Sequence, residues 1–585
     1  MKKSNLFFAF VATLLLATSA MAQYTPAETF YAAGSSAQFN TFALAAGYPI
    51  YSGGALCGNH RWTQKTSSAN PITLNDPRSS SILPEPGNIW IVWNDAAANH
   101  TSGGVVCFFV VVDSIVGVRS YQARATVSLP AGLVGVADAG IVPLLGFSGP
   151  GGTAETLPAN IQSIVNGAVI NVGITDIRPE DAKFATMRAL TAYGTQVTGR
   201  SATGVGYGPF PLGTTIQSSQ SGGIANPVDF AIDPGDTDPI NSSVPVRHYA
   251  ESGTGAAPVM VFANQQNTGS GHFGDGNYTN INRFVLANVL SGNESHIRAI
   301  ATVAGEADAG IHVFIREPLS GTYSTMEWCV PNSREVSGDP SWGVGAVSGQ
   351  ESNINPSNNS CTTKPCTVES GNPLWHIFAN GGTRGRVVGS GDMVTAVNNT
   401  ADGFGYSFWN FSSYQGKSHI KYLTVDGVDP LYSGPNDNPN GVGVFPQCTV
   451  NGSGQVTSCP QLTFPNIVNG TYPIWSKYRL MYDPTDSTNI ATAVVAYAQE
   501  AANPGGGNPG SGILTDFLPA TKLQVFRSHY AQVVRDNGIA YGPNNGLKSG
   551  VPETGGDAGG AVFTVQSELD FIADTGGNQQ VNFKQ

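Results

Sequence analysis

Short apolar runs that alternate with helix-patterned segments constrain the fold of this chain more than any other feature of its sequence. Runs rich in β-branched and aromatic residues predict strands at 89–93, 105–112, 168–172, 258–263, 311–315 and 404–408. Apolar residues at helical spacing predict helices at 157–166, 281–290 and 490–501. Because alternating strands and helices are typical of α/β units, we expect an α/β fold with parallel sheets.

Long polar segments interrupt this alternation. They are rich in Gly, Ser, Asn, Thr and Pro, and they cover residues 58–87, 195–250, 331–375 and 433–465. We interpret them as loop insertions on a smaller α/β body and not as separate domains. The sequence contains no repeat of fixed period, which leaves a solenoid unsupported.

The first 22 residues have the three-part pattern of an export signal. Lys2 and Lys3 give a positive start, an apolar run covers 6–17, and Ala20 and Ala22 frame a small-x-small cleavage site. The apolar run is short for a membrane span, and no cysteine follows the expected cut as a lipid attachment point. We therefore expect a protein in the periplasm, or secreted, after cleavage near Ala22. The alternative is an uncleaved anchor.

The charge balance narrows the classes of partner. The net charge is −12 at pH 7, and only 12% of the residues are charged. Nucleic acids and anionic membranes favour a basic protein face, so neither is expected as a partner. A small anionic ligand remains compatible with this charge, because local donors govern a single buried site.

Seven cysteines in an exported chain make disulfides plausible. Cys57 and Cys107 fall in one N-terminal region, and Cys448 and Cys459 could close a local loop. The other three, at positions 329, 361 and 366, form a middle group. Because the count is odd, one cysteine of this group should remain unpaired. No cysteine or histidine has the spacing of a metal site, and no G-x-S-x-G elbow is present. We therefore predict no metal, no cofactor and no enzymatic activity.

The segment 311–322, IHVFIREPLSGT, carries the most informative chemistry. A predicted strand ends at Arg316, and Ser320, Gly321 and Thr322 follow where a helix can begin. A helix N-terminus presents N–H donors and a positive dipole end, which suits an oxyanion. Gly321 allows close backbone approach, and Arg316 can add a charge-assisted hydrogen bond. The alternative is a capped helix beside a surface arginine.

Three other turns supply similar chemistry. Gly34-Ser35-Ser36 lies near the mature N-terminus, Asp113 to Gly117 follows the strand 105–112, and Gly173 to Asp176 follows the strand 168–172. Each turn, taken alone, is also compatible with a simple N-cap or loop. The ends of strands are, however, where open α/β sheets bind ligands.

In order, these turns (GSS, DSxxG, GITD and RxxxSGT) resemble the phosphate-binding periplasmic component of ABC transporters, which has the type II periplasmic-binding-protein fold. Further similar segments lie downstream, at 282–292 (NRFVLANVLSG), 404–409 (FGYSFW), 421–430 (KYLTVDGVDP) and 469–482 (NGTYPIWSKYRLMY). The resemblance covers most of the α/β body and none of the insertions.

The resemblance implies a set of anion ligands, carried over by motif: Ser36, Ser114, Asp176, Arg316, Ser320, Gly321 and Thr322. Asp176 would accept a hydrogen bond from the P–OH group of phosphate. Sulfate has no such proton at neutral pH, and a buried acceptor left facing another acceptor costs about 2–7 kcal/mol.

The sequence departs from the family pattern beside the arginine and in two of the turns. Two residues after the arginine, the family often has an acid that pairs with it, whereas here Pro318 stands there and Glu317 is displaced by one. Ala37 replaces a bulky residue, and the second loop has fewer glycines. These departures leave the counter-ion of Arg316 open.

The resemblance also implies two lobes joined by a hinge, with long polar loop insertions. After the signal peptide 1–22, lobe one would begin with 23–255, lobe two would be 256–430, and 431–585 would return to lobe one. A phosphate or a related oxyanion would close the cleft of a monomer, and an inner-membrane ABC permease would recognise the closed form. Two other classes remain: an exported structural or adhesive protein that retains this fold, and a secreted phosphatase.

Overall fold

The computed structural model describes three main parts of the chain, 24–177, 247–330 and 374–527. Gaps within them lie at 49–54, 66–71, 76–81, 86–87, 144–154, 248, 275–277, 292–293, 295, 301–308, 317–319, 378–380, 388, 453 and 508–510. Short strand segments are also described at 200–201, 211–212, 533–534, 541–542 and 562–564. The predicted signal peptide and most of the insertions 195–250 and 331–375 lie outside the described residues.

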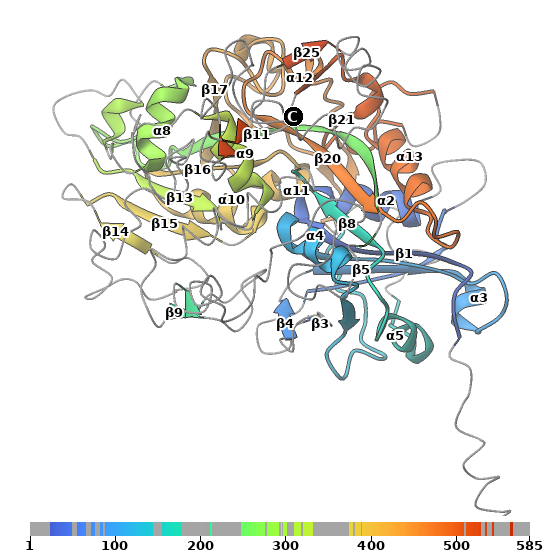
Figure 1. Cartoon of the computed structure of the whole chain (residues 1–585). Coiled ribbons are helices and arrows are strands. Elements are labelled where there is room, and N and C mark those ends of the chain that lie inside the picture. The colour runs from blue at the N-terminus through green and yellow to red at the C-terminus, as the bar shows by residue number, and fades with distance from the viewer. Residues whose placement is uncertain are drawn as a thin grey trace, which may run out of the picture.

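One large mixed sheet runs through the molecule (Figure 1). Its strands, in spatial order, are β14 (Leu374–Ile377), β15 (Thr383–Val387), β13 (His312–Arg316), β16 (Gly403–Phe408), β11 (Ala250–Asn264), β20 (Trp475–Tyr482), β8 (Val172–Thr175), β1 (Glu28–Ser35), β6 (Val105–Val112), β5 (Asn88–Trp93) and β2 (His60–Lys65). The main helices are α2 (Phe39–Gly47), α4 (Ser114–Gln122), α5 (Ala159–Val165), α8 (Arg283–Ser291), α9 (Gly321–Cys329), α10 (Ser390–Asn399) and α13 (Ala491–Ala501). The predicted α/β class is confirmed.

The sheet is mixed, which differs from the parallel sheets expected from the alternation. Strand β1 pairs in parallel with β6 and β8, and β13 pairs in parallel with β15 and β16. The pairs β5–β6, β8–β20 and β11–β16 are antiparallel. Antiparallel neighbours can follow each other directly in the chain, and β5 and β6 do so through residues 94–104, which include the short helix α3 (Asp95–Ala98).

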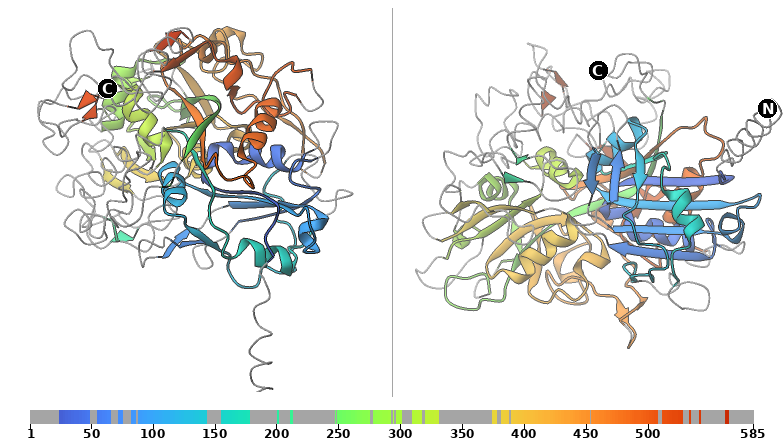
Figure 2. Two further views of the ribbon diagram at one scale, coloured as in Figure 1. Left: turned by 45° about the vertical axis from the view of Figure 1, so that its right-hand side comes forward. Right: turned by 90° about the horizontal axis from the view of Figure 1, so that it is seen from below.

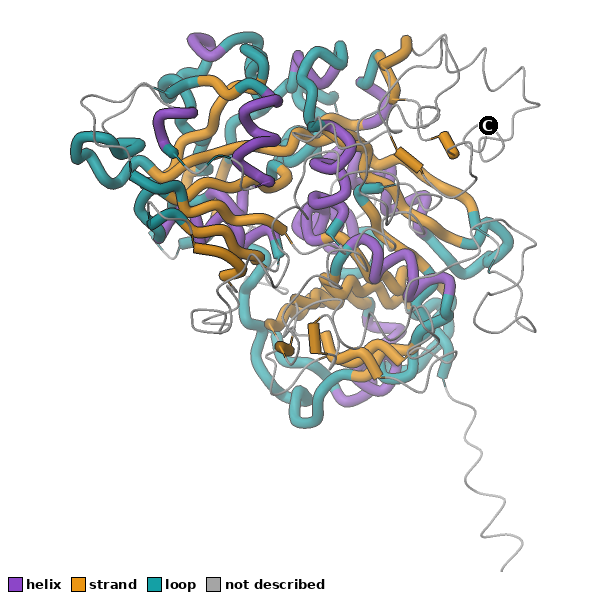
Figure 3. The backbone as a smooth tube through the Cα atoms, turned by 60° about the vertical axis from the view of Figure 1, so that its left-hand side comes forward, coloured by secondary structure: helices purple, strands orange, loops and turns teal. Residues whose placement is uncertain are grey.

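Strand β11 belongs to two groups of strands. Its first part, Ala250 to Pro258, pairs with β20, and its second part, Val259 to Ala263, pairs with β16. One lobe of the described chain therefore holds β1, β2, β5, β6 and β8, and the other holds β13 to β16. The views in Figures 2 and 3 show these lobes as two groups of strands, with helices packed between and around them.

Most predicted elements are observed close to their expected bounds, and one strand begins later than expected. The predicted strand 168–172 is observed as β8, which begins at Val172. The preceding residues pair elsewhere: Val127 N donates to Ala168 O, and Ile170 N donates to Ala125 O. The chain therefore contacts the segment 125–127 before it enters the large sheet.

Buried aromatic side chains fill both lobes. Trp62, Trp90 and Trp93 are fully buried in the first lobe, and Trp409 and Trp475 are fully buried farther along the chain. Full burial of such side chains removes large apolar areas from water, at about 25 cal/mol per Å². The helices in the described parts of the chain are all too short or too polar to cross a membrane.

Two disulfides are present among the described cysteines. Cys57 bonds to Cys107 on β6, and Cys448 bonds to Cys459. The second bond closes the short hairpin of β18 (Thr449–Val450) and β19 (Val456–Ser458), so this part of the insertion 433–465 has regular structure. Cys329 of the middle group is buried, whereas Cys361 and Cys366 lie outside the described residues.

Candidate anion-binding site

Three strand ends of the first lobe place polar side chains at one edge of the sheet. Strands β6 and β8 pair with β1 in register, with Gly34 opposite both Val111 and Ile174, so the three strands end at the same level. The residues that follow are Ser35 and Ser36 after β1, Asp113 and Ser114 after β6, and Asp176 after β8. This half of the site is therefore formed by residues that follow the carboxyl ends of three parallel strands.

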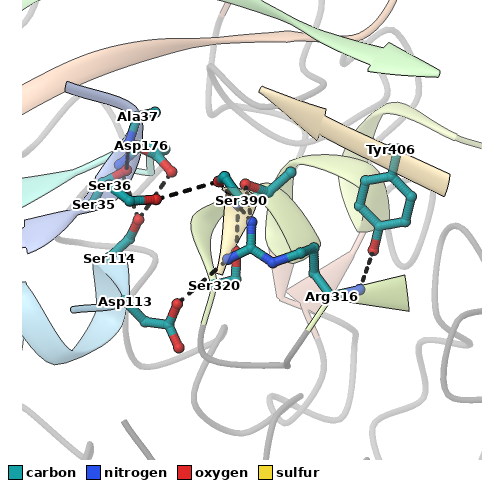
Figure 4. Close-up of polar contacts among 11 residues, drawn as sticks. Ser35, Ser36, Ala37, Asp113, Ser114, Asp176, Arg316, Ser320, Ser390 and Tyr406 are labelled. Atoms are coloured by element: carbon teal, nitrogen blue, oxygen red, sulfur yellow. Dashed lines mark hydrogen bonds and ion pairs between the residues drawn. The ribbon is translucent and has the colours of Figure 1, made fainter. Parts of the chain in front are cut away.

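The second lobe contributes the other half. Strand β13 ends at Arg316, and α9 begins at Gly321. The side chain of Ser320 caps this helix by accepting a hydrogen bond from Thr322 N at 3.1 Å. Helix α10 begins at Ser390, which points toward Arg316 in Figure 4.

Asp176 is the buried acid of the site. Ser114 Oγ donates to Asp176 Oδ2 at 3.0 Å, and Asp176 is only 2% exposed. Burial raises the pKa of Asp176 to about 6, although the hydroxyls of Ser35 and Ser114 and the charge of Arg316 act to lower it. Among the described residues, none provides a hydrogen-bond partner for Asp176 Oδ1.

Arg316 connects the two halves. Its Nη2 lies 3.6 Å from Asp113 Oδ1, in the first lobe. Its Nη1 donates to Ser390 Oγ at 2.9 Å and to Thr322 Oγ1 at 3.3 Å (Figure 4). Ser36 Oγ in turn donates to Ser390 Oγ at 3.2 Å. Arg316 is only 2% exposed. Its guanidinium group is therefore held by groups from both lobes.

Gly321 brings the N-terminus of α9 against the first lobe. A Cβ atom at this position would lie 2.5 Å from Ser114 Oγ and 2.7 Å from Asp176 Oδ2. Real Cβ atoms do not approach side-chain oxygens this closely, so only glycine fits. The positive end of α9 thus lies close to the carboxylate of Asp176.

The structure brings all seven predicted site residues together. Ser114, Asp176 and Gly321 lie against one another, and Arg316 contacts Thr322. Ser36 joins the cluster through Ser390, and Ser320 caps α9 inside it. These residues come from distant segments of the chain, and all of them are buried except Ser36, which is half-buried.

Sequence reasoning missed two members of the cluster. Asp113 is the acid beside Arg316, whereas Glu317, the displaced acid in the sequence, lies outside the described residues, as does Pro318. A signal was available for Asp113, because it directly precedes Ser114 in the DSxxG turn. Ser390 follows a long insertion and belongs to no motif that was recognised.

The cluster consists mainly of hydrogen-bond donors. Hydroxyls, one guanidinium and the N-termini of α4, α9 and α10 offer hydrogen-bond donors and partial positive charge. Asp176 offers the opposite, a buried acceptor. Within the described ranges, no group of three or more His, Cys, Asp or Glu side chains is arranged to hold a metal ion.

Comparisons with known proteins give matches at the level of structure alone. No protein-family model and no curated protein sequence matches the chain. The phosphate-binding protein from Stenotrophomonas maltophilia matches with a TM-score of 0.32 and 11% identity, over 71% of this chain and 84% of that one. An ABC-type phosphate transport receptor from Vibrio cholerae matches with a TM-score of 0.22 and 13% identity, over 45% and 71%. Likenesses at this level do not say what this chain binds.

Proposed function

We propose that this chain is an exported solute-binding protein that captures phosphate, or a related protonated oxyanion, between two lobes for ABC-type uptake. The single observation that carries the proposal is the cluster itself. Ser36, Ser114, Asp176 and Arg316 come from four separate segments and meet in one place, where Ser114, Asp176 and Arg316 are buried and Ser36 is half-buried. Buried donors that gather from both lobes beside a carboxylate oxygen with no partner among the described residues favour an anion that brings both an acceptor and an O–H group.

The proposed selectivity depends on Asp176. A carboxylate in this position accepts a hydrogen bond from an O–H group of the ligand, while the hydroxyls and Arg316 donate to its other oxygens. Sulfate at neutral pH offers only acceptors, so it would face Asp176 with no hydrogen between two oxygens. The unmade hydrogen bond costs about 2–7 kcal/mol, which is enough for strong discrimination.

In this proposal β11 and β20 form the hinge. The chain leaves the first lobe along β11 and returns along β20, and the two strands pair with each other from Ala250 to Pro258. Ligand contacts on both lobes then couple binding to closure. An inner-membrane permease would recognise the closed form, and no turnover takes place on the protein.

Isothermal titration calorimetry of the purified mature chain tests the function directly. We expect phosphate to bind with a stoichiometry of one and sulfate to bind at least about a hundredfold more weakly. If neither anion binds at millimolar concentration, the protein is better described as an exported structural or adhesive protein that retains the fold. Release of phosphate from a phosphate ester by the same preparation, with added divalent metals, would instead support a secreted phosphatase.

A further inference from the structure

Ser390, the first residue of α10, lies inside the cluster but belongs to none of the motifs that predicted it. The residue is 4% exposed. Its Oγ accepts one hydrogen bond from Arg316 Nη1, at 2.9 Å, and one from Ser36 Oγ, at 3.2 Å (Figure 4). Ser390 therefore contacts a predicted ligand residue in each lobe.

The hydrogen-bonding capacity of the Ser390 hydroxyl is only partly used by these contacts. A serine hydroxyl has two acceptor lone pairs and one donor hydrogen. Arg316 and Ser36 each donate to one lone pair, so the hydroxyl hydrogen of Ser390 is the only part of the group still able to form a hydrogen bond. In the described part of the chain, the Ser390 hydrogen has no acceptor. A buried polar group left in this state is costly, so the site favours a ligand that brings an acceptor.

Asp176 has the complementary requirement. Its Oδ1 is buried and has no donor among the residues that the structure describes. Ser390 thus needs an acceptor, and Asp176 needs a donor. A single small group satisfies both if it carries bare oxygens and at least one O–H, as a protonated tetrahedral oxyanion does.

The start of α10 adds to the attraction for an anion. Gly389 occupies the N-cap with φ +83°, and as a glycine it has no side chain to cap the helix. By contrast, the side chain of Ser320 caps α9. The first turn also contains the exposed acid Asp392, so this carboxylate partly opposes the partial positive charge that the helix N-terminus brings beside the Ser390 hydroxyl.

We propose that Ser390 is a further ligand residue of this site, which donates its hydroxyl hydrogen to one oxygen of a protonated tetrahedral oxyanion. The inference rests on the proposed function. It adds α10 to the elements that contact the anion, and it gives the second lobe a hydroxyl donor outside the S-G-T turn.

The test compares Ser390→Ala with a matched substitution, Ser412→Ala. Ser412 is an exposed first-turn serine of α11 (Phe411–Tyr414) in the same lobe, and it bonds only to Asn410 among its described contacts. Calorimetry with inorganic phosphate should show about tenfold weaker binding for Ser390→Ala, which is about 1.4 kcal/mol. Ser412→Ala should bind as the wild type does.

A second variant separates the hydroxyl from the shape of the side chain. Ser390→Thr keeps the hydroxyl and should remain within about threefold of the wild-type affinity. Equal binding by wild type and Ser390→Ala overturns the inference, and so does equally weak binding by the Ala and Thr variants. If the wild type itself binds neither phosphate nor sulfate, the proposed function fails, and this inference fails with it.

Discussion

Asp113 Oδ1 lies 3.6 Å from Arg316 Nη2, so the buried guanidinium of one lobe has its acid in the other. The family that the sequence resembles often places this acid two residues after the arginine, on the same turn. Here the acid follows β6, and the ion pair therefore spans both lobes. If the lobes close on a ligand as proposed, closure would also bring Arg316 to its acid.

Asp113→Asn should destabilise the ligand-free protein and increase its response to an anion. Removing one partner of a buried ion pair costs up to about 3–5 kcal/mol, because a charge stays buried without compensation. A bound anion supplies that compensation. Differential scanning calorimetry should show a lower Tm without ligand and a larger rise in Tm on adding phosphate.

The matched control for Asp113→Asn is Asp426→Asn. Asp426 pairs with Arg283 at 2.6 Å, but both side chains are about one-third exposed, at 31% and 36%. Exposed pairs contribute about 0–1 kcal/mol, so the Tm and the phosphate response should stay close to wild type. Identical thermograms for the two variants would mean that the pair between the lobes contributes no more than a surface pair.

Asp176→Asn should narrow the preference for phosphate over sulfate. The amide can donate a hydrogen bond, so an oxygen without a proton becomes an acceptable neighbour. We expect sulfate affinity to rise by about tenfold or more and phosphate affinity to fall. Competition binding with the two anions measures the ratio, and an unchanged ratio would remove Asp176 from the selectivity mechanism.

The pKa of Asp176 predicts a specific dependence of stability on pH. Because this pKa is raised from 3.8 to about 6 by burial, the folded protein holds the proton more tightly than the unfolded chain does. The free energy of unfolding should therefore fall as pH rises from about 4 to 6, by up to about 3 kcal/mol, and stay lower above pH 6. Urea unfolding at a series of pH values checks this.

Asp516 requires a control in that experiment, because burial also raises its pKa, to about 7. It accepts from Phe411 N at 2.8 Å and from Thr41 Oγ1 at 3.3 Å, and neither partner is one of the predicted anion ligands. Its contribution has the same sign and extends to higher pH. The difference between wild type and Asp176→Asn isolates the Asp176 step, and a difference that does not vary between pH 4 and 6 would contradict the assignment.

Gly321→Ala should prevent the lobes from closing on a ligand. The added methyl would lie 2.5 Å from Ser114 Oγ and 2.7 Å from Asp176 Oδ2, so α9 must move away from the first lobe. We expect phosphate affinity to fall by about a hundredfold or more, equivalent to about 2.7 kcal/mol. Calorimetry gives the affinity, and small-angle scattering with phosphate should show a larger radius of gyration than wild type.

Gly391→Ala is the matched substitution for Gly321→Ala. Gly391 lies in the first turn of α10, and a Cβ atom there would meet nothing within 4 Å. Alanine should fit and slightly stabilise the helix, by about 0.5–1 kcal/mol. Equal phosphate binding by the two variants would show that α9 has more room than the structure indicates.

The sequence predicted the fold best where a segment carries its own signal. The strand 105–112 has the predicted bounds because eight β-branched, aromatic or other apolar residues follow one another. The first part of β11 was not predicted, because Glu251 to Gly255 are small or polar and become a strand only by pairing with β20. The sequence also did not indicate which strands pair in parallel and which pair antiparallel, because this depends on which strands become neighbours in the folded protein.

The residues of the site were likewise predicted only where a local sequence motif marked them. The four turns were recognised because each combines a strand end with a short motif, and their order matched one family. Ser390 begins a helix whose local sequence resembles any other helix start. Its role, like that of Asp113, depends on the distance between lobes, which no local pattern contains.

The change of partner within β11 has a practical consequence. At Pro258 the strand passes from β20 to β16, so this short stretch of backbone lies between the two lobes in the proposed hinge. A small rotation there is magnified at the far rims. If the chain captures an anion as proposed, dyes attached at the exposed positions 101 and 399, on opposite sides of that point, would report capture as a change in energy transfer, without a fused reporter.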